Sequence, residues 1–272
     1  MTILDQIVES KQSEIKKHRS SVSLNDFDGF EYTHRSTFSF KDALQRKDGP
    51  SSQMPSIITE FKRGSPSKGH FAPDATPSVQ CRAYEQGGAA ACSILTDSPF
   101  FHGSLQDLSE ARSHVQLALL RKDFIIDPYQ VFEAKAFGAD AILLIERILS
   151  DTQINELVDA AKQCHLGVLM ELDSAEAWSR IEPFRERLSA VGINSRNLAT
   201  FDTDADSGFQ QLDQIPSSVV RVLESGIHSY EPLLSCARHQ IDAALIGEAL
   251  MRAPNPASLL QTWMQEVNDE LE

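Results

Sequence analysis

Two residues of opposite charge lie two positions apart in a segment that the sequence predicts to be a buried strand. The segment ITEFKRGSPSKG carries Glu60 and Lys62 just before a turn rich in Gly, Ser and Pro. Side chains alternate along a strand, so these two share one face while Phe61 points to the other. A buried charge is costly unless it is paired. The two residues are therefore either a structural ion pair at a rim or a functional acid–base pair.

Polar residues also follow most of the later apolar runs. They are Thr96-Asp97, Arg121-Lys122-Asp123, Glu171, Asn194 with Arg196, Glu224-Ser225-Gly226 and Gly247. In a parallel barrel the carboxyl ends of the strands meet at one face, and chemistry occurs there. The repetition favours an active site over a set of unrelated ion pairs.

Two glycine-containing turns suit a phosphate group. ESGI contains Gly226 and LIGEAL contains Gly247, and both follow late strands, where barrels often bind phosphate. Glycine lets backbone N–H groups approach an anion, and a helix beginning near Glu248 would add its positive N-terminal end. Ser65 could supply a hydroxyl. The alternative is that these are ordinary strand–helix turns.

The elements that would position these groups form a regular alternation. Near-continuous apolar runs predict parallel strands covered on both faces, and helix-like stretches such as 127–138 and 151–165 lie between them. Eight such units are the number found in a (β/α)8 barrel. An open doubly wound sheet is the alternative, but KRGSPSKG does not match its usual glycine-rich first turn. The predicted strands are 56–62, 91–96, 117–122, 139–145, 166–171, 188–194, 219–224 and 242–247.

The first 55 residues lie outside this repeat. Residues 2–18 have one apolar face at helical spacing, and a second short helix is expected within 37–46. No low-complexity linker follows, so we expect a single domain over 1–272, with an N-terminal helical extension (1–55) packed on the barrel (56–272).

Composition limits the partners. The 272 residues carry a net charge of -14, which leaves no basic surface for nucleic acid or an anionic membrane. No apolar run reaches the length of a membrane span, and the charged N-terminus is not a secretory signal. The four cysteines lack metal or CxxC spacing, which predicts reduced thiols in a cytoplasmic protein. The histidines show no metal-binding spacing, and no GxSxG motif is present.

Several long segments resemble one known family. They are EFKRGSPSKG (60–69), GGAAACSILTDSPFFHGS (87–104), LLRKDFIIDPYQVFEAKAFGADAILLI (119–145), VGINSRNL (191–198), LESGI (223–227) and ALIGEALMR (244–252). In these segments the chain resembles indole-3-glycerol phosphate synthase. The resemblance implies a (β/α)8 TIM barrel with an N-terminal helical extension over the active-site end. It also implies a tryptophan-biosynthesis lyase that needs no cofactor.

The implied substrate is 1-(2-carboxyphenylamino)-1-deoxy-D-ribulose 5-phosphate, which gives indole-3-glycerol phosphate, carbon dioxide and water. By motif, Lys122 matches the general acid for ring closure. Lys62 matches the lysine that binds the anthranilate carboxylate and can donate a later proton. Glu171 matches a catalytic base or electrostatic partner, and Glu60 completes a proton network with Lys62. The sequence leaves open which lysine protonates the leaving hydroxyl.

The remaining matches concern binding. Asn194 and Arg196 match substrate-positioning residues, and Phe101 and Phe124 are candidates either for the wall around the anthranilate ring or for simple core packing. The positions that match the anion side are Ser65, Ser225, Gly226, Gly247 and Glu248, the last through its backbone N–H. We expect a monomer that binds a phosphorylated small molecule. The alternatives are another phosphosugar-binding barrel, of the phosphoribosyl isomerase type, and a non-catalytic phosphosugar-binding barrel.

Overall fold

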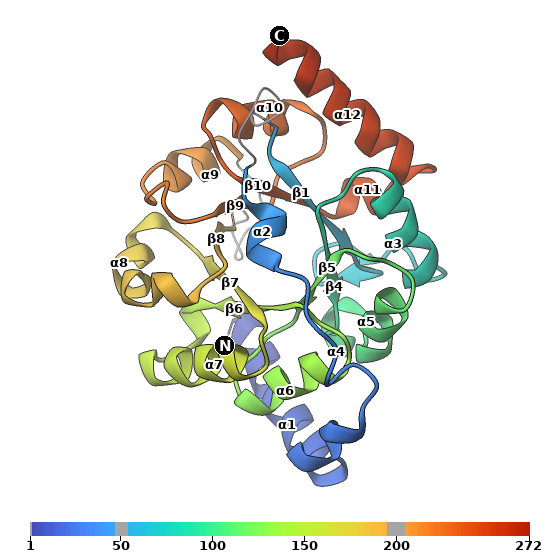
Figure 1. Ribbon diagram of the computed structural model, residues 1–272, viewed down its shortest axis with the longest axis vertical. Coiled ribbons are helices and arrows are strands. Elements are labelled where there is room, and N and C mark those ends of the chain that lie inside the picture. Colours follow the sequence, from blue (N-terminus) through green and yellow to red (C-terminus); the bar gives the residue numbers. More distant parts are fainter. Residues whose placement is uncertain (1, 47–53, 195–204) are drawn as a thin grey trace.

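The computed structural model describes residues 2–46, 54–194 and 205–272. Its centre is a closed barrel of parallel strands in the order β1-β10-β9-β8-β7-β6-β5-β4, with β4 pairing back to β1 (Figure 1). Each apolar run predicted as a strand overlaps one of them, so the (β/α)8 prediction is confirmed and the open sheet is wrong. The strands are β1 (Ser56–Phe61), β4 (Ala91–Leu95), β5 (Ala118–Lys122), β6 (Ala141–Ile145), β7 (Gly167–Leu172), β8 (Ala190–Ile193), β9 (Arg221–Leu223) and β10 (Ala243–Ile246).

Helices surround the barrel (Figure 1). The predicted helices over 127–138 and 151–165 correspond to α6 (Pro128–Ala136) and α7 (Asp151–Gln163). Asp127 caps α6 by accepting from the Tyr129 N–H, and Gly138 follows its end with a φ of 94°, a conformation that favours glycine. The helices after β1 are α3 (Pro77–Gln86), α4 (Ser98–Phe101), α5 (Leu105–Arg112), α6 (Pro128–Ala136), α7 (Asp151–Gln163), α8 (Trp178–Ile181), α9 (Ala205–Leu212), α10 (Glu231–Arg238), α11 (Glu248–Arg252) and α12 (Pro256–Leu271).

Side-chain alternation along the strands separates two apolar layers. On β1, Ile57 and Phe61 belong to the layer between the strands and the helices, whereas Ile58 belongs to the barrel interior. The interior layer consists largely of Ala, Leu, Ile and Val from the other strands. This alternation turns Glu60 toward the barrel axis, as predicted.

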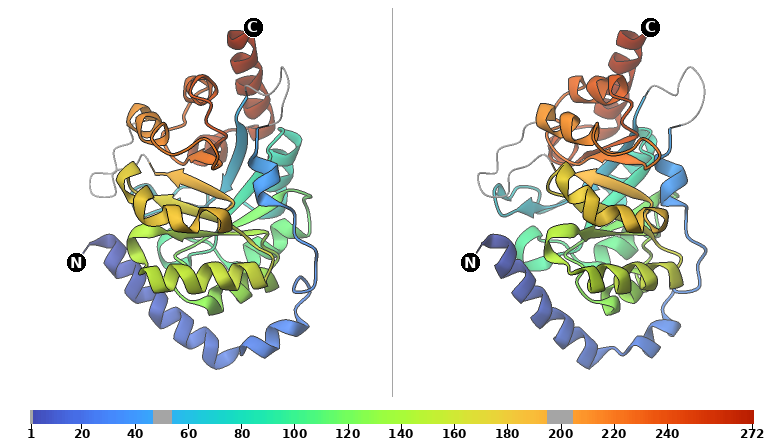
Figure 2. Two further views of the ribbon diagram at one scale, coloured as in Figure 1. Left: turned by 60° about the vertical axis from the view of Figure 1, so that its left-hand side comes forward. Right: turned by 90° about the vertical axis from the view of Figure 1, so that its left-hand side faces the viewer.

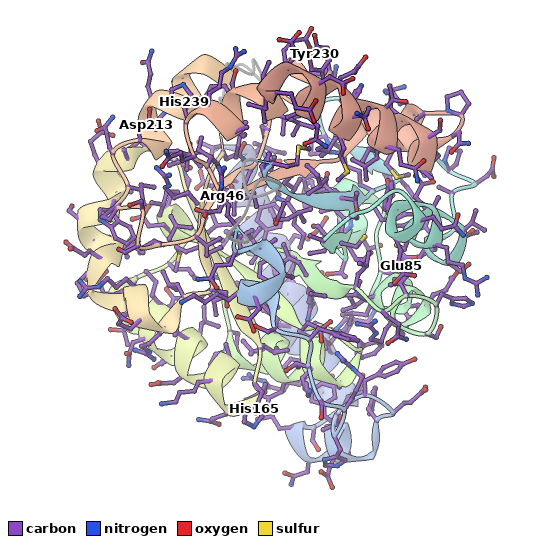
Figure 3. The ribbon with its side chains drawn as sticks, turned by 45° about the horizontal axis from the view of Figure 1, so that its top comes forward. Arg46, Glu85, His165, Asp213, Tyr230 and His239 are labelled. Atoms are coloured by element: carbon purple, nitrogen blue, oxygen red, sulfur yellow. The ribbon has the colours of Figure 1, made fainter. Side chains whose placement is uncertain are left out.

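Two N-terminal helices pack against opposite ends of the barrel (Figure 2). Helix α1 (Ile3–Ser21) begins at a capping box made by Thr2 and Asp5, and it lies across the carboxyl ends of the strands. Helix α2 (Phe40–Leu44) packs beneath the amino ends, where Phe40 lies against the start of β7. Both were predicted, but α1 runs further than residue 18 and α2 is shorter than 37–46. In Figure 3, Arg46 lies just after α2, and its guanidinium donates to the Ile241 carbonyl at 3.4 Å.

The segment after β1 contains a feature that the sequence did not predict. Strands β2 (Gly64–Ser65) and β3 (Gly69–His70) form a small antiparallel hairpin, where only a turn was expected. Arg63 anchors it through a two-pronged ion pair with Asp107, both contacts at 2.7 Å. Two-residue strands are too short to produce a periodic signal, which is why the sequence did not reveal them.

None of the helices in the described part of the chain is long and apolar enough to cross a membrane.

Candidate active site

A cavity opens at the carboxyl ends of the strands and brings together nearly all of the predicted site residues. The space between its walls, open solvent at the mouth included, amounts to about 1230 Å³. Arg196 lies outside the described residues. The predicted residues that line the cavity are Glu60, Lys62, Ser65, Phe101, Lys122, Phe124, Glu171, Asn194, Ser225, Gly226, Gly247 and Glu248.

Glu60 and Lys62 form the ion pair that their spacing predicted. Their side chains meet at 2.6 Å on the cavity side, while Phe61 is buried against the helices. Gly247 makes room for them: a Cβ at this position would lie 3.0 Å from the Lys62 Nζ and closer still to the Glu60 carboxylate. The glycine after β10 therefore leaves space for the Glu60–Lys62 pair at the end of β1, in addition to its place in its own turn.

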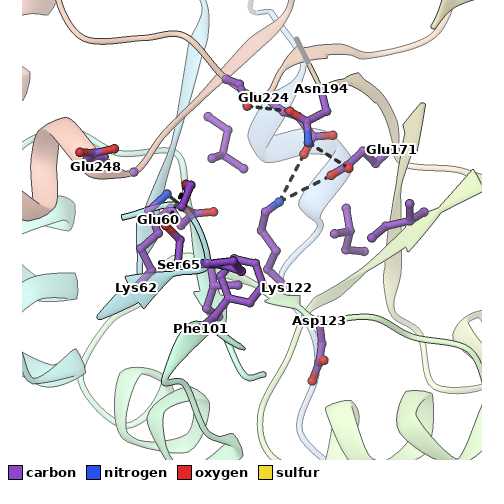
Figure 4. Close-up of a pocket in the computed structure, with 18 of the residues that line it drawn as sticks. Glu60, Lys62, Ser65, Phe101, Lys122, Asp123, Glu171, Asn194, Glu224 and Glu248 are labelled. Atoms are coloured by element: carbon purple, nitrogen blue, oxygen red, sulfur yellow. Dashed lines mark hydrogen bonds and ion pairs between the residues drawn. The ribbon is translucent and has the colours of Figure 1, made fainter. Parts of the chain in front are cut away.

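Lys122 lies between two carboxylates at the end of β5 (Figure 4). Its Nζ is 3.6 Å from Glu171 and 3.6 Å from Glu224. Burial alone would lower the pKa of Lys122, but the negative charges of Glu171 and Glu224 outweigh burial and raise that pKa above its usual value. The neighbouring glutamates therefore favour the charged form of Lys122.

Glu171 is held by a short chain of hydrogen bonds (Figure 4). The side-chain amide nitrogen of Asn194 donates to Glu171 Oε1 at 3.1 Å, and the Ser225 hydroxyl donates to Asn194 Oδ1 at 2.7 Å. These bonds fix the orientation of the Asn194 amide. Glu171 thus presents its other oxygen to Lys122, so three predicted residues from separate strand ends act on one another.

Glu224 is a site residue to which the sequence analysis assigned no role. Both of its oxygens are buried and lack a hydrogen-bond partner among the described residues. Burial raises the pKa of Glu224 well above its usual range, and the charge of Glu171 raises it further, against the opposing effect of Lys122. A sequence signal existed: Val220, Val222 and Glu224 alternate, and both valines belong to the interior layer.

Apolar side chains close the side of the cavity next to α1. Phe101 and Phe124 both line it, with ring centroids 6.0 Å apart. Leu4 and Ile7 of α1 join them, packed in the same interior layer. The sequence predicted that the extension packs on the barrel, but it did not predict these two as cavity residues.

The hairpin after β1 and the turns after β9 and β10 give the cavity the features of an anion site. Ser65 is buried there, with its hydroxyl 3.4 Å from that of Ser67. Gly226 has a φ of 87°, which favours glycine. The Glu248 carboxylate is turned to Arg252 at 2.9 Å, which agrees with a role for its backbone rather than its charge. Within the described ranges, no group of three or more His, Cys, Asp or Glu side chains is arranged to hold a metal ion.

Comparison with known proteins agrees with this geometry. A family model described as indole-3-glycerol phosphate synthase matches residues 4–262. The chain belongs to the indole-3-glycerol phosphate synthase family. It is 38% identical to the synthase of Bacteroides thetaiotaomicron, over 97% of this chain and 98% of that one. It is 40% identical to the synthase of Polynucleobacter asymbioticus, over 95% and 97%.

Similar solved structures confirm the barrel. The 3-hexulose-6-phosphate synthase of Salmonella typhimurium matches with a TM-score of 0.61 at 14% identity, covering 80% of this chain and all of that one. A mutant tryptophan synthase alpha-subunit from Pyrococcus furiosus matches with a TM-score of 0.59 at 14% identity, covering 78% and 97%. At such low identity the likeness shows the fold alone.

Membership of the indole-3-glycerol phosphate synthase family settles the class of activity. The chain is a carboxy-lyase of tryptophan biosynthesis, as the sequence predicted, and a phosphorylated small molecule is a fitting substrate. The family match favours this function over the isomerase and non-catalytic alternatives.

Proposed function

We propose that this chain converts 1-(2-carboxyphenylamino)-1-deoxy-D-ribulose 5-phosphate into indole-3-glycerol phosphate, with Lys122 as the acid of the first step. The observation that carries the proposal is the position of the Lys122 ammonium, 3.6 Å from both Glu171 and Glu224, in a cavity that is also lined by aromatic side chains and by the glycine turns after β9 and β10. The extension and the barrel act as one domain, because Leu4 and Phe40 both pack in the barrel interior.

The cavity orients a substrate that is aromatic at one end and phosphorylated at the other. The phosphate binds at Ser225, Gly226, Gly247, Ser65 and the backbone N–H of Glu248. The anthranilate ring packs between Phe101, Phe124 and α1, and Lys62 binds its carboxylate. Asn194, already fixed by Ser225, and Arg196 position the chain of the sugar. The two buried oxygens of Glu224 accept hydrogen bonds from substrate hydroxyls, and a protonated Glu224 donates one instead.

Ring closure is the step in which Lys122 acts. The ring carbon that bears the carboxylate attacks the ribulose carbonyl carbon, a carbon–carbon bond forms, and the carbonyl π electrons move to oxygen. Lys122 gives that oxygen a proton. Its raised pKa keeps the proton in place until the oxyanion develops, and an alkoxide is basic enough to take it.

Decarboxylation restores the aromatic ring. The bond to the carboxylate breaks, carbon dioxide leaves, and the electron pair of that bond returns to the ring. Lys62 holds the carboxylate up to this point, and it is released from that contact when carbon dioxide departs. Glu60, 2.6 Å away, remains beside its ammonium.

Dehydration completes the indole. Glu171 removes a proton from the carbon next to the nitrogen, a carbon–carbon double bond forms, and the hydroxyl leaves as water with a proton from Lys62. We assign this proton to Lys62 because Lys122 has already given up its own. Glu171 lies 3.6 Å from Lys122 and can return the abstracted proton to it, which resets the first acid. Lys62 regains its proton from solvent, and this is the one proton that the overall reaction consumes.

Turnover of the substrate tests the proposal. Wild type should form a product with indole fluorescence, and Lys122→Ala should form almost none, because removal of a general acid costs about 10²–10⁴ in rate. Lys41→Ala is the matched control, since Lys41 is exposed on α2 at the other end of the barrel. Unchanged turnover by Lys122→Ala would show that Lys122 is not the acid.

A further inference from the structure

Lys11 interrupts the apolar face of α1. Leu4, Ile7, Lys11 and Ile15 are spaced so that they share one face of the helix, and all four are buried. Lys11 is only 1% exposed. A buried ammonium is costly unless carboxylates surround it, so its presence in this apolar face calls for a specific set of partners.

Three carboxylates supply that set. The Lys11 Nζ lies 2.9 Å from Glu14 on its own helix, 3.1 Å from Asp97 and 2.9 Å from Asp123. Asp97 follows β4 and caps α4 by accepting from the Phe100 N–H at 2.8 Å. One cation on the extension therefore connects two strand ends of the barrel.

Asp123 brings this contact next to the proposed acid. It follows Lys122 directly in the chain and is held from its other side by Thr96 at 2.6 Å and Arg121 at 3.1 Å. Because its oxygens are shared between these groups and Lys11, the backbone at the end of β5 is fixed relative to α1. Lys122 itself points the other way, toward Glu171.

The same contact sets where α1 lies over the cavity. Ile7 is one helical turn from Lys11, and Leu4 is two turns away on the same face. Both line the cavity and pack in the layer that contains Phe124. At the far end of α1, His18 and Arg19 also pair with Glu133 and Asp127. At the end that covers the cavity, Leu4 and Ile7 make apolar contacts, which are not directional, and Lys11 makes the ion pairs.

We propose that Lys11 is a positioning residue: its pairing with Asp97 and Asp123 holds α1 so that Leu4 and Ile7 cover the aromatic end of the bound substrate. The inference rests on the proposed function. It predicts a selective effect, because Lys11 pairs with Glu14, Asp97 and Asp123, none of which belongs to the glycine turns after β9 and β10. Loss of Lys11 should therefore weaken contacts with the ring and spare those with phosphate.

The test compares the substrate, the product and inorganic phosphate across four variants. Lys11→Met should raise KM for the substrate and Kd for indole-3-glycerol phosphate about tenfold, the scale of one lost apolar side-chain contact. Its kcat should change much less, and its Kd for inorganic phosphate should stay within about twofold of wild type. Lys11→Arg keeps the charge and should retain most of the affinity. Lys16→Met removes an exposed lysine from the same helix and should match wild type.

A double variant serves as the control for loss of folding. Lys11→Met leaves Asp97 without its cation, so Lys11→Met/Asp97→Asn removes the buried charge together with the contact, and asparagine can still cap α4. This double variant should show the same rise in KM and product Kd. An unchanged product Kd in both variants, or an equal rise for phosphate, would overturn the proposal. Lack of turnover by wild type would instead overturn the proposed function, and the two affinities would still test Lys11.

Discussion

Gly192 on β8 leaves open the space that the Glu224 carboxylate occupies next to it. A Cβ at Gly192 would lie 2.7 Å from the Glu224 carboxyl carbon, closer than real contacts allow. The carboxylate follows β9, whose Val222 is paired with Gly192 across the ladder. The absence of one side chain thus permits a buried acid to stand beside Lys122.

Gly192→Ala should displace Glu224 and disturb Lys122. We expect kcat/KM to fall about 10–100-fold, because small misplacements in an active site are costly, with a loss of about 1–3 kcal/mol in the free energy of unfolding from overpacking. Steady-state kinetics and urea denaturation measure the two effects. Gly29→Ala is the control, since a Cβ there meets nothing within 4 Å. Equal activity of the two variants would show that the space is not needed.

Glu224→Gln should change how stability depends on pH. The pKa of Glu224 is raised in the folded protein, chiefly by burial, so the folded state holds this proton more tightly than the unfolded state. The stabilisation it gives is complete below the usual carboxyl pKa and is lost as pH rises through the folded-state pKa. Glutamine does not titrate. Relative to wild type, the variant should therefore gain stability between pH 4 and pH 8, by about 1.4 kcal/mol per unit of pKa shift.

Urea unfolding of Glu224→Gln and wild type at the two pH values measures this difference, because groups common to both proteins cancel. The exposed Glu270 of α12 offers the control Glu270→Gln, which should show no such change. A constant difference between Glu224→Gln and wild type across this pH range would contradict the raised pKa.

Lys62→Met should separate two steps of the reaction. Without the ammonium that binds the substrate carboxylate, KM should rise about 10–100-fold, the range measured for lost charge-assisted hydrogen bonds. Molecules that do close their ring should still release carbon dioxide, but dehydration should be slow. Carbon dioxide should then appear faster than indole fluorescence in a single turnover. Equal rates of the two products would show that Lys62 does not donate the second proton.

The sequence predicted the barrel well because its signal is local and repeated. Each apolar run corresponds to a strand, and the alternation of Glu60, Phe61 and Lys62 predicted which side chains face the cavity. Successive side chains of a strand point to opposite faces, so the face of each residue can be read from its position in the sequence. The sequence placed Glu224 at a strand end without assigning it a role, although the same rule applied to Val220 and Val222 turns its side chain toward the cavity.

Contacts between distant segments could not be predicted in the same way. Lys11 meets Asp97 and Asp123 only because α1 crosses two strand ends, a geometry that depends on how the helix docks. The balance of burial and charge on Lys122 likewise needed distances, since Glu171 and Glu224 come from strands remote in sequence. The spacing of residues along the chain gives neither the docking of a helix nor the distances between charged groups.

The most direct test of the central claim is a single turnover of Lys122→Met in which carbon dioxide and indole fluorescence are measured together. If Lys122 protonates the carbonyl oxygen during ring closure, the variant should release neither product at an appreciable rate, because decarboxylation requires the closed ring. Wild type and Lys41→Met should release both. Carbon dioxide released by Lys122→Met at the wild-type rate, with indole formation alone blocked, would contradict the account and move Lys122 to the dehydration step.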